Sequence, residues 1–180
     1  MPVDRFGGGS LMVWGAVHYA GKTNLIVIRQ TPNAQRYCDG ILRPVVAPFM
    51  RRNNRCIFQQ DHTRPHIAPL SSNVLLAKNV NTFPWPSRSP DLAPIEHIWD
   101  MLNRQIRENH HPFNSLQELE NALIIEWNAI QQYKIQNLIR GCRDTITANG
   151  TWTRYWYCGF LCEFIRCHVL HSVNQEVCEW

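Results

Sequence analysis

Hydrophobic and polar residues alternate along the chain in patterns that predict both strands and helices. Short apolar runs rich in β-branched residues lie at residues 11–17 and 25–28, and residues 19–24 between them have the composition of a turn. These two runs predict a β-hairpin. Further compact apolar runs predict strands at residues 56–60 and 80–85.

Apolar residues at helical spacing predict helices between these strands. One predicted helix follows the hairpin, and a shorter one covers residues 74–77 before the fourth strand. The first of them carries its apolar side chains at Ala34, Tyr37, Ile41, Val45 and Phe49. Because Pro44 and Pro48 do not fit inside a regular helix, we expect a kink or a break there.

A longer amphipathic helix is predicted from about Pro94, whose fixed φ suits the first helical turn. Its apolar stripe, which we expect to be buried, consists of Ile95, Ile98, Trp99, Leu102 and Ile106. Its polar face consists of Glu96, Asp100, Asn103 and Arg107. Glu96 therefore falls in the first turn, where the helix dipole favours an acid and where amides without helical partners face nearby anions.

Two further helices are predicted to complete the core. The first begins with a capping-box pattern, Ser115 followed three residues later by Glu118. Its apolar stripe is Leu116, Leu119, Leu123, Trp127 and Ile130. The second has the stripe Ile135, Leu138, Ile139, Cys142 and Ile146, and Asn149-Gly150 is a good stop signal. The predicted order is β-β-α-β-α-β-α, followed by this helical pair.

The composition fits one globular domain. With 180 residues, of which 44% are hydrophobic, the chain has enough apolar side chains for a core. The net charge of +4 and the pI of about 8.8 are compatible with a polyanionic partner, yet they fit an ordinary slightly basic protein equally well. We find no signal-peptide pattern, and charged residues interrupt the apolar segment 156–173, so we expect neither secretion nor a membrane span.

The seven cysteines divide into two groups. Cys38, Cys56 and Cys142 lie in periodic apolar segments, which predicts buried, reduced thiols and an intracellular protein. Four more lie in the tail together with two histidines: Cys158, Cys162, Cys167, Cys178, His168 and His171. Their number would suffice for zinc, but no pair has the two-residue separation of zinc ribbons, so an appended, poorly packed extension is the preferred interpretation of the tail.

Two carboxylates carry the candidate chemistry. Asp61 directly follows the third predicted strand, and 34 residues separate it from Glu96, which lies at the start of the long helix. Hard oxygen ligands from separate elements are what Mg²⁺ or Mn²⁺ requires at a site that transfers phosphodiester bonds. The pair indicates phosphoryl transfer, although an acid in a first helical turn is by itself more often a response to the helix dipole.

The residues around both acids resemble those of mariner-type transposases of the Tc/mariner superfamily. The similarity rests on residues 58–66, FQQDHTRPH, and residues 85–99, WPSRSPDLAPIEHIW, and extends from about Val3 to Tyr155. It implies an α/β fold of RNase H type, a mixed sheet flanked by helices, with a catalytic carboxylate triad. Asp61 would be the second member and Glu96 the third, both binding Mg²⁺ or Mn²⁺.

The same resemblance implies that one strand and one acid are missing from the expected pattern. The first catalytic Asp of the family lies on a central strand upstream of a segment similar to residues 4–10, and neither Asp4 nor Asp39 replaces it. Closing the gap in the sheet would require a rearrangement or another chain. We expect a partial catalytic core at residues 1–110, C-terminal helices of the same domain at 111–155 and a divergent tail at 156–180.

The functional hypothesis is a transposase catalytic-domain fragment for metal-dependent DNA cleavage and strand transfer, with little or no activity alone. Whether it is an enzyme stays open, because His62 and Ala93 also replace family asparagines. Expected partners are DNA and another transposase chain, in the nucleus. Arg64 and Arg88 would hold DNA phosphates or neutralise the neighbouring acids. A noncatalytic binding module and a decayed transposon remnant are the alternatives.

Overall fold

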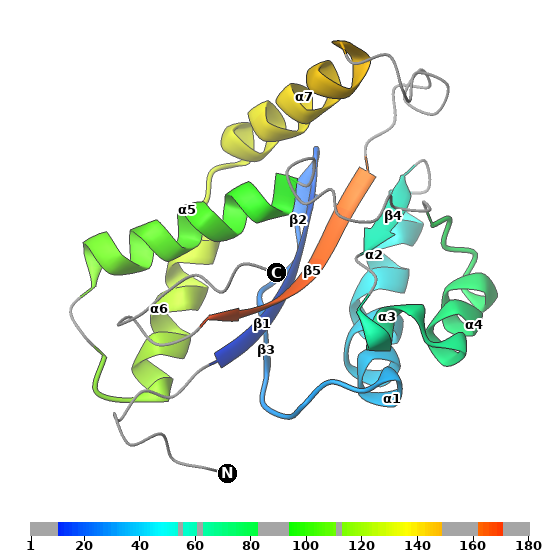
Figure 1. Ribbon diagram of the computed structural model, residues 1–180, viewed down its shortest axis with the longest axis horizontal. Coiled ribbons are helices and arrows are strands. Elements are labelled where there is room, and N and C mark those ends of the chain that lie inside the picture. The colour runs from blue at the N-terminus through cyan, green and yellow to red at the C-terminus, as the bar shows by residue number, and fades with distance from the viewer. Residues whose placement is uncertain are drawn as a thin grey trace.

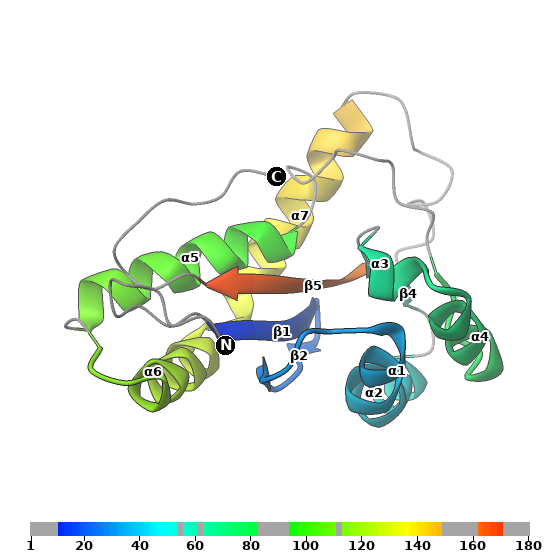
Figure 2. The same ribbon diagram turned by 60° about the horizontal axis from the view of Figure 1, so that its bottom comes forward.

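A mixed β-sheet separates two groups of helices in the computed structural model (Figures 1 and 2). The structure describes residues 11–53, 56–60, 63–82, 94–110, 113–148 and 162–170, and of residues 142–148 and 162–170 it describes the backbone alone. Helices α5–α7 cover one face of the sheet, and the helices α1–α4 lie on the other side of the strands. We call these the α5–α7 face and the α1–α4 face.

The predicted hairpin is confirmed, with an interruption in its second arm. Strand β1 (Leu11–His18) pairs antiparallel with β2 (Gly21–Lys22) and with β3 (Ile26–Ile28). The register shifts by one residue between these two ladders, as at a β-bulge. Thr23 fills the interruption, because its backbone N–H donates to the Ala16 carbonyl and its Oγ1 accepts from the Ala16 N–H, each at 2.9 Å.

The proline-containing helix after the hairpin is continuous but changes its winding. Helix α1 (Ala34–Tyr37) leads into the π-helical segment η1 (Cys38–Val46), which leads into α2 (Ala47–Arg52). A proline ring ordinarily clashes with the carbonyl four residues earlier, and wider π winding relieves this clash for Pro44. Pro48 follows as the second residue of α2, directly after the π-helical segment.

The next elements lead to and from the candidate site. Strand β4 (Ile57–Gln60) confirms the third predicted strand and is followed by α3 (Arg64–Ile67) and α4 (Pro69–Ala77). Helix α4 includes the predicted helix 74–77 but begins five residues earlier. The described part of the fourth predicted strand is a single parallel bridge between Thr82 and Phe58, supported by a hydrogen bond from the Phe58 N–H to the Asn81 carbonyl at 2.7 Å.

Strand β5 (Cys162–Leu170) occupies the centre of the sheet, between β1 and β4. It runs antiparallel to β1, from Leu11 opposite Leu170 to Val17 opposite Phe164. It runs parallel to β4, from Ile57 opposite Cys162 to Gln60 opposite Ile165. The central position that the sequence left empty is therefore filled by a rearrangement, and a segment predicted to be an appended extension provides the strand.

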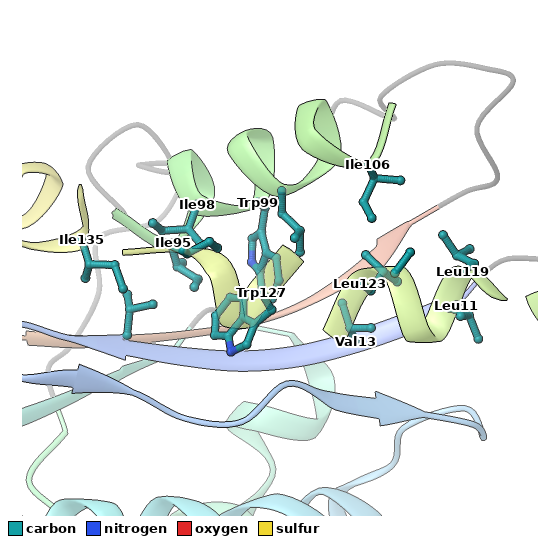
Figure 3. Packing of buried hydrophobic residues seen from close by; sticks show 14 of the residues in the cluster. Leu11, Val13, Ile95, Ile98, Trp99, Ile106, Leu119, Leu123, Trp127 and Ile135 are labelled. Atoms are coloured by element: carbon teal, nitrogen blue, oxygen red, sulfur yellow. The ribbon is translucent and has the colours of Figure 1, made fainter. Parts of the chain in front are cut away.

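Helices α5 (Pro94–Asn109), α6 (Leu116–Ala129) and α7 (Gln132–Ala148) form the larger apolar core with β1. All five predicted stripe residues of α5 are buried. At the centre the indole rings of Trp99 and Trp127 stack with centroids 5.3 Å apart, above strand β1 (Figure 3). Leu116 departs from the prediction, because 46% of it is exposed, and Cys142 and Ile146 lie outside the described side chains.

Polar contacts fix the ends of α6. Ser115 caps its start by accepting from the Glu118 N–H at 3.2 Å, as predicted, while the Glu118 carboxylate accepts from the Asn114 N–H at 2.9 Å. At the other end the Lys22 ammonium donates to the carbonyls of Asn128 at 3.2 Å and Ile130 at 2.5 Å. A cation at this end is favourable for the helix dipole, and burial lowers the pKa of Lys22.

The α1–α4 face has a second apolar core, joined to the first through β1. Side chains alternate along a strand, so Val13 and Val17 enter the first core whereas Trp14 and Ala16 enter the second. The other members include Tyr37, Leu42 and Phe58, from α1, η1 and β4. Among the described residues, none of the helices has both the length and the apolar character that a membrane crossing needs.

Candidate catalytic site at the end of β4

The end of β4 is held in place by a glutamine. Gln60, the last residue of the strand, accepts a hydrogen bond from the Tyr37 hydroxyl at 2.8 Å and donates from Nε2 to the His66 carbonyl at 3.3 Å. The rings of Tyr37 and His66 also lie against each other, with centroids 4.3 Å apart. Strand β4, helix α1 and helix α3 are thus linked at the residue that directly precedes Asp61.

A second polar contact anchors the segment after Asp61. The Ser71 hydroxyl, which is fully buried, donates to the Pro65 carbonyl at 2.6 Å and lies 3.6 Å from the Cys38 thiol. Helix α3 is therefore fastened to both α4 and η1. Its first residue, Arg64, is exposed at the surface beside the end of β4.

Glu96 lies in the first turn of α5, as predicted, and is half-buried. Its helix packs against β1 and β5 through the apolar stripe, which fixes the height of the first turn above the sheet. The Oε1 atom of Glu96 is covered by surrounding atoms rather than exposed to bulk water. A carboxylate in this setting has the hard oxygen donors that Mg²⁺ and Mn²⁺ prefer.

Another buried polar group lies on β4. Gln59 is 3% exposed, and its Oε1 accepts no hydrogen bond from the part of the chain that the structure describes. A buried amide oxygen ordinarily has a partner, so this atom is a candidate acceptor for a water molecule or a cation near the site. Among the described residues no three His, Cys, Asp or Glu side chains gather closely enough to hold a metal ion.

Half of the predicted site residues can be placed. Glu96 lies in the first turn of α5, as predicted, and Arg64 is the first residue of α3, whereas Asp61 and Arg88 lie outside the described residues, as do His62 and Ala93. His66, the last residue of the segment 58–66 that carries the resemblance, is 2% exposed and packs on Tyr37.

The sequence analysis overlooked the glutamines of β4 and their partner Tyr37. The available signal was the pair Gln59-Gln60 at the end of an apolar strand, directly before an acid. Two amides in a buried strand require partners, and that requirement points to a polar network. Tyr37 was assigned to a helical apolar stripe, which is correct for its ring but not for its hydroxyl.

A buried histidine–cysteine contact lies where β1 ends and β4 begins. The Nε2 atom of His18 is 2.9 Å from the Cys56 thiol, and its Nδ1 accepts from the Ala20 N–H at 3.2 Å. With Nδ1 as acceptor, the neutral ring carries its proton on Nε2 and donates it to sulfur. Burial lowers the pKa of His18, which keeps the ring neutral. Cys38 and Cys56 are buried thiols outside any disulfide, as predicted.

Comparison with known proteins identifies the family of this chain. The DDE superfamily endonuclease family matches residues 5–120. The Tc1 transposase of Caenorhabditis elegans and the Tcb1 transposase of Caenorhabditis briggsae are each 34% identical, over 165 and 162 residues, which is 86% of this chain. The chain spans 58% of the length of each of these two relatives.

Solved structures show the same fold. The crystal structure of the catalytic domain of Mos1 mariner transposase is similar with a TM-score of 0.60 and 21% identity, over 82% of both chains. A Mos1 transposase paired-end complex with the left transposon end gives a TM-score of 0.62 and 23% identity, over 84% of this chain and 46% of that one. The fold is therefore RNase H-like, and the chain belongs to the DDE superfamily endonucleases, among the transposases of Tc1/mariner type.

Proposed function

We propose that this chain is the catalytic-domain part of a Tc1/mariner-type transposase, and that it acts on DNA through a divalent metal bound by Asp61 and Glu96. The observation that carries the proposal is the position of Glu96, which an apolar helix stripe holds at the first turn of α5 above the central strands. Mos1 transposase structures with Mg and with Mn support the choice of metal. Bound there, the metal would activate a water molecule and stabilise a departing oxygen.

The residues around the site have supporting roles in this proposal. Gln60 would fix the end of β4 and thereby the backbone that leads into Asp61. Arg64, exposed on α3, would hold a DNA phosphate by paired hydrogen bonds, and Arg88 would do the same from its own segment. The partners would be DNA and a second transposase chain, as in the Mos1 paired-end complex, and the location the nucleus.

Metal-dependent cleavage tests the proposal directly. We would incubate the chain with labelled double-stranded DNA and Mn²⁺, and compare it with Asp61→Asn and Glu96→Gln. Cleavage that requires Mn²⁺ and disappears in both variants supports the catalytic function. Asp100→Asn is a matched control, because Asp100 lies one turn further along α5 and is exposed. If Asp100→Asn abolished cleavage while Glu96→Gln did not, the assignment of Glu96 would be wrong.

The weak activity expected from the sequence stays a prediction, and it leads to the second candidate function. A chain that binds DNA or another transposase chain without cutting would be a noncatalytic module. Metal-independent DNA binding that Asp61→Asn and Glu96→Gln leave unchanged would favour this module. The polar network around Gln60 favours it as well, because its hydrogen bonds join protein groups and order the surface near Arg64.

Thermal unfolding with and without Mn²⁺ would show whether the metal site is assembled, independently of whether the chain cleaves DNA. A cooperative transition that Mn²⁺ raises in the parent chain, but not in Asp61→Asn, would mean that the metal site is assembled even where cleavage is slow. A broad transition that Mn²⁺ does not shift would contradict the proposed metal site and favour a decayed remnant.

A further inference from the structure

The position of β5 between β1 and β4 suggests a second binding activity. The two neighbouring strands form the walls of a slot, which we define as the β1–β4 slot. One wall offers a ladder of seven residue pairs, from Leu11–Leu170 to Val17–Phe164, and the other a ladder of four. A strand in this slot is recognised mainly by its backbone, because both of its edges are hydrogen-bonded.

The walls of the slot are held independently of β5. Trp14 of β1 and Phe58 of β4 belong to the same apolar cluster, which fixes the spacing of the two strands on the α1–α4 face. The His18–Cys56 contact at 2.9 Å joins the end of β1 to the residue before β4. Strand β1 is also paired with β3 on its other edge. A site whose walls are already in place binds with a smaller cost in ordering.

The present occupant has an unusual composition for its position. Central strands of sheets covered on both faces are usually uninterrupted apolar runs, and β1 follows this rule, with seven of its eight residues buried. Strand β5 instead contains Glu163, Arg166 and His168 among nine residues. Residues 149–161 separate it from α7 in the chain, and within the described structure β5 pairs with β1 and β4 in the slot and lies against α5.

We propose that the β1–β4 slot is a strand-binding site from which β5 can be displaced. The displacing partner is an extended segment of another protein chain, apolar at each position along its length, that runs antiparallel to β1 and parallel to β4. Such a segment gains both ladders and has the uninterrupted apolar composition that is usual for a central strand. The chain would thus join another protein by strand exchange, and its own β5 would occupy the slot when no partner strand is bound.

A disulfide lock provides the control for the experiment. Met12 and Val169 are directly opposite in the antiparallel ladder, at a separation typical of disulfides, so Met12→Cys with Val169→Cys is expected to close under mild oxidation. Met12→Cys with His168→Cys is one residue out of register and is expected not to close, because neighbouring residues of a strand alternate between faces. Mass spectrometry of proteolytic peptides identifies the bond among the native cysteines. Failure of the in-register pair to close would overturn the placement of β5.

The probe is a fluorescent, lysine-flanked peptide of residues 162–170 with Glu163→Val, Arg166→Val and His168→Val. Fluorescence anisotropy is expected to show that it binds the full chain at least about tenfold more tightly than the natural nine-residue sequence does, because an uninterrupted apolar run suits a central strand better. A control peptide that also carries Ile165→Pro is expected not to bind, because proline interrupts the ladder.

The lock decides whether binding occurs in the slot. The in-register variant should bind the apolar peptide when reduced and lose binding when oxidised, whereas the out-of-register variant should bind under both conditions. Equal binding to the oxidised and reduced in-register variant, or no binding of the apolar peptide to the parent chain, would overturn the proposal. Neither DNA nor metal enters the measurement, so its failure leaves the proposed transposase function untouched.

Discussion

On the α5–α7 face the sheet is closed by apolar side chains, whereas on the α1–α4 face polar contacts are interspersed with the apolar ones. The first face is centred on the stacked pair Trp99–Trp127, and the acid that is buried there among the described residues, Glu126, is paired with Asn109 and His110 at the far end of α5. The second face contains the Tyr37–Gln60 hydrogen bond, the buried hydroxyl of Ser71 and the His18–Cys56 contact.

This difference indicates that one face mainly stabilises the fold whereas the other mainly positions the candidate site. Apolar burial is strong but non-directional, so the α5–α7 face is suited to supply most of the free energy of unfolding and to hold the helix that carries Glu96. Hydrogen bonds are weaker in net terms but directional, so the α1–α4 face is suited to fix the end of β4 next to the site. Substitutions on the first face should therefore change stability more than substitutions on the second.

The largest effect is expected for Trp127→Ala on the α5–α7 face. Trp127 is fully buried, and its Nε1 donates to the Thr23 carbonyl at 2.8 Å, so truncation leaves a large cavity and an acceptor without its donor. We expect a loss of about 3–5 kcal/mol in the free energy of unfolding. Denaturant titration followed by circular dichroism measures it. Trp127→Phe should lose clearly less, and an equal loss would mean that the hydrogen bond matters more than the ring.

A smaller loss on the same face is expected for Gly15→Ala. A Cβ atom at Gly15 would lie 2.8 Å from the six-membered ring of Trp127, too close for the packed indole to accept without moving. We expect a loss of about 1–3 kcal/mol. Gly21→Ala is the matched control, because nothing lies within 4 Å of its added Cβ, and it should change stability by less than about 0.5 kcal/mol. Equal melting temperatures for the two variants would contradict the close packing of Trp127 on β1.

On the α1–α4 face we expect a modest effect of Tyr37→Phe. The change removes the hydroxyl that donates to Gln60 while the buried ring keeps its place, at a cost of about 0.5–1.5 kcal/mol. Tyr133→Phe is the control, since 54% of Tyr133 is exposed. The comparison becomes sharper in the DNA cleavage assay, where Tyr37→Phe should lower the rate at a temperature at which it is fully folded. Unchanged cleavage would mean that Gln60 does not position the site.

The smallest effect is a pH dependence due to His18. Because burial lowers its pKa below the ordinary 6.5, the folded chain binds fewer protons than the unfolded chain. The stabilising contribution is therefore complete above the ordinary value and is lost as pH falls through it towards the folded-state pKa. Between about pH 7.5 and about pH 5.5 the parent should lose more stability than His18→Gln. Parallel slopes in denaturant titrations at several pH values would show that His18 does not titrate on unfolding.

Periodicity predicted the α5–α7 face well because its signal is local. The stripe of α5 repeats with one helical period, and each of its five predicted members is buried. The capping box at Ser115 was equally predictable, since a spacing of three residues between two polar side chains defines it. The hairpin was predicted for the same reason, although its bulge at Thr23 was not, because a one-residue register shift leaves no mark on the apolar pattern.

The features that escaped prediction depend on residues far apart in the chain. The Tyr37–Gln60 hydrogen bond joins a helix to a strand. The π winding of η1 allows a continuous helix to contain Pro44, and the apolar pattern alone does not predict this winding. The placement of β5 is the extreme case, because no local property of residues 162–170 indicates that they pair with both β1 and β4. Of the candidate site, the sequence predicted the place of Glu96 in the first turn of α5 and overlooked the supporting amides, while the roles of Glu96 and Arg64 stay predictions.

The central position of β5 also governs the order in which this chain can fold. Its ladder with β1 joins residues that are almost the whole described length apart, such as Leu11 and Leu170, and contacts of this kind slow folding because a long loop must close first. During synthesis β1 and β4 emerge from the ribosome long before β5 and would expose open edges to other chains. A newly made chain is thus most vulnerable to aggregation, and most receptive to a foreign strand, in the interval before its last described element is complete.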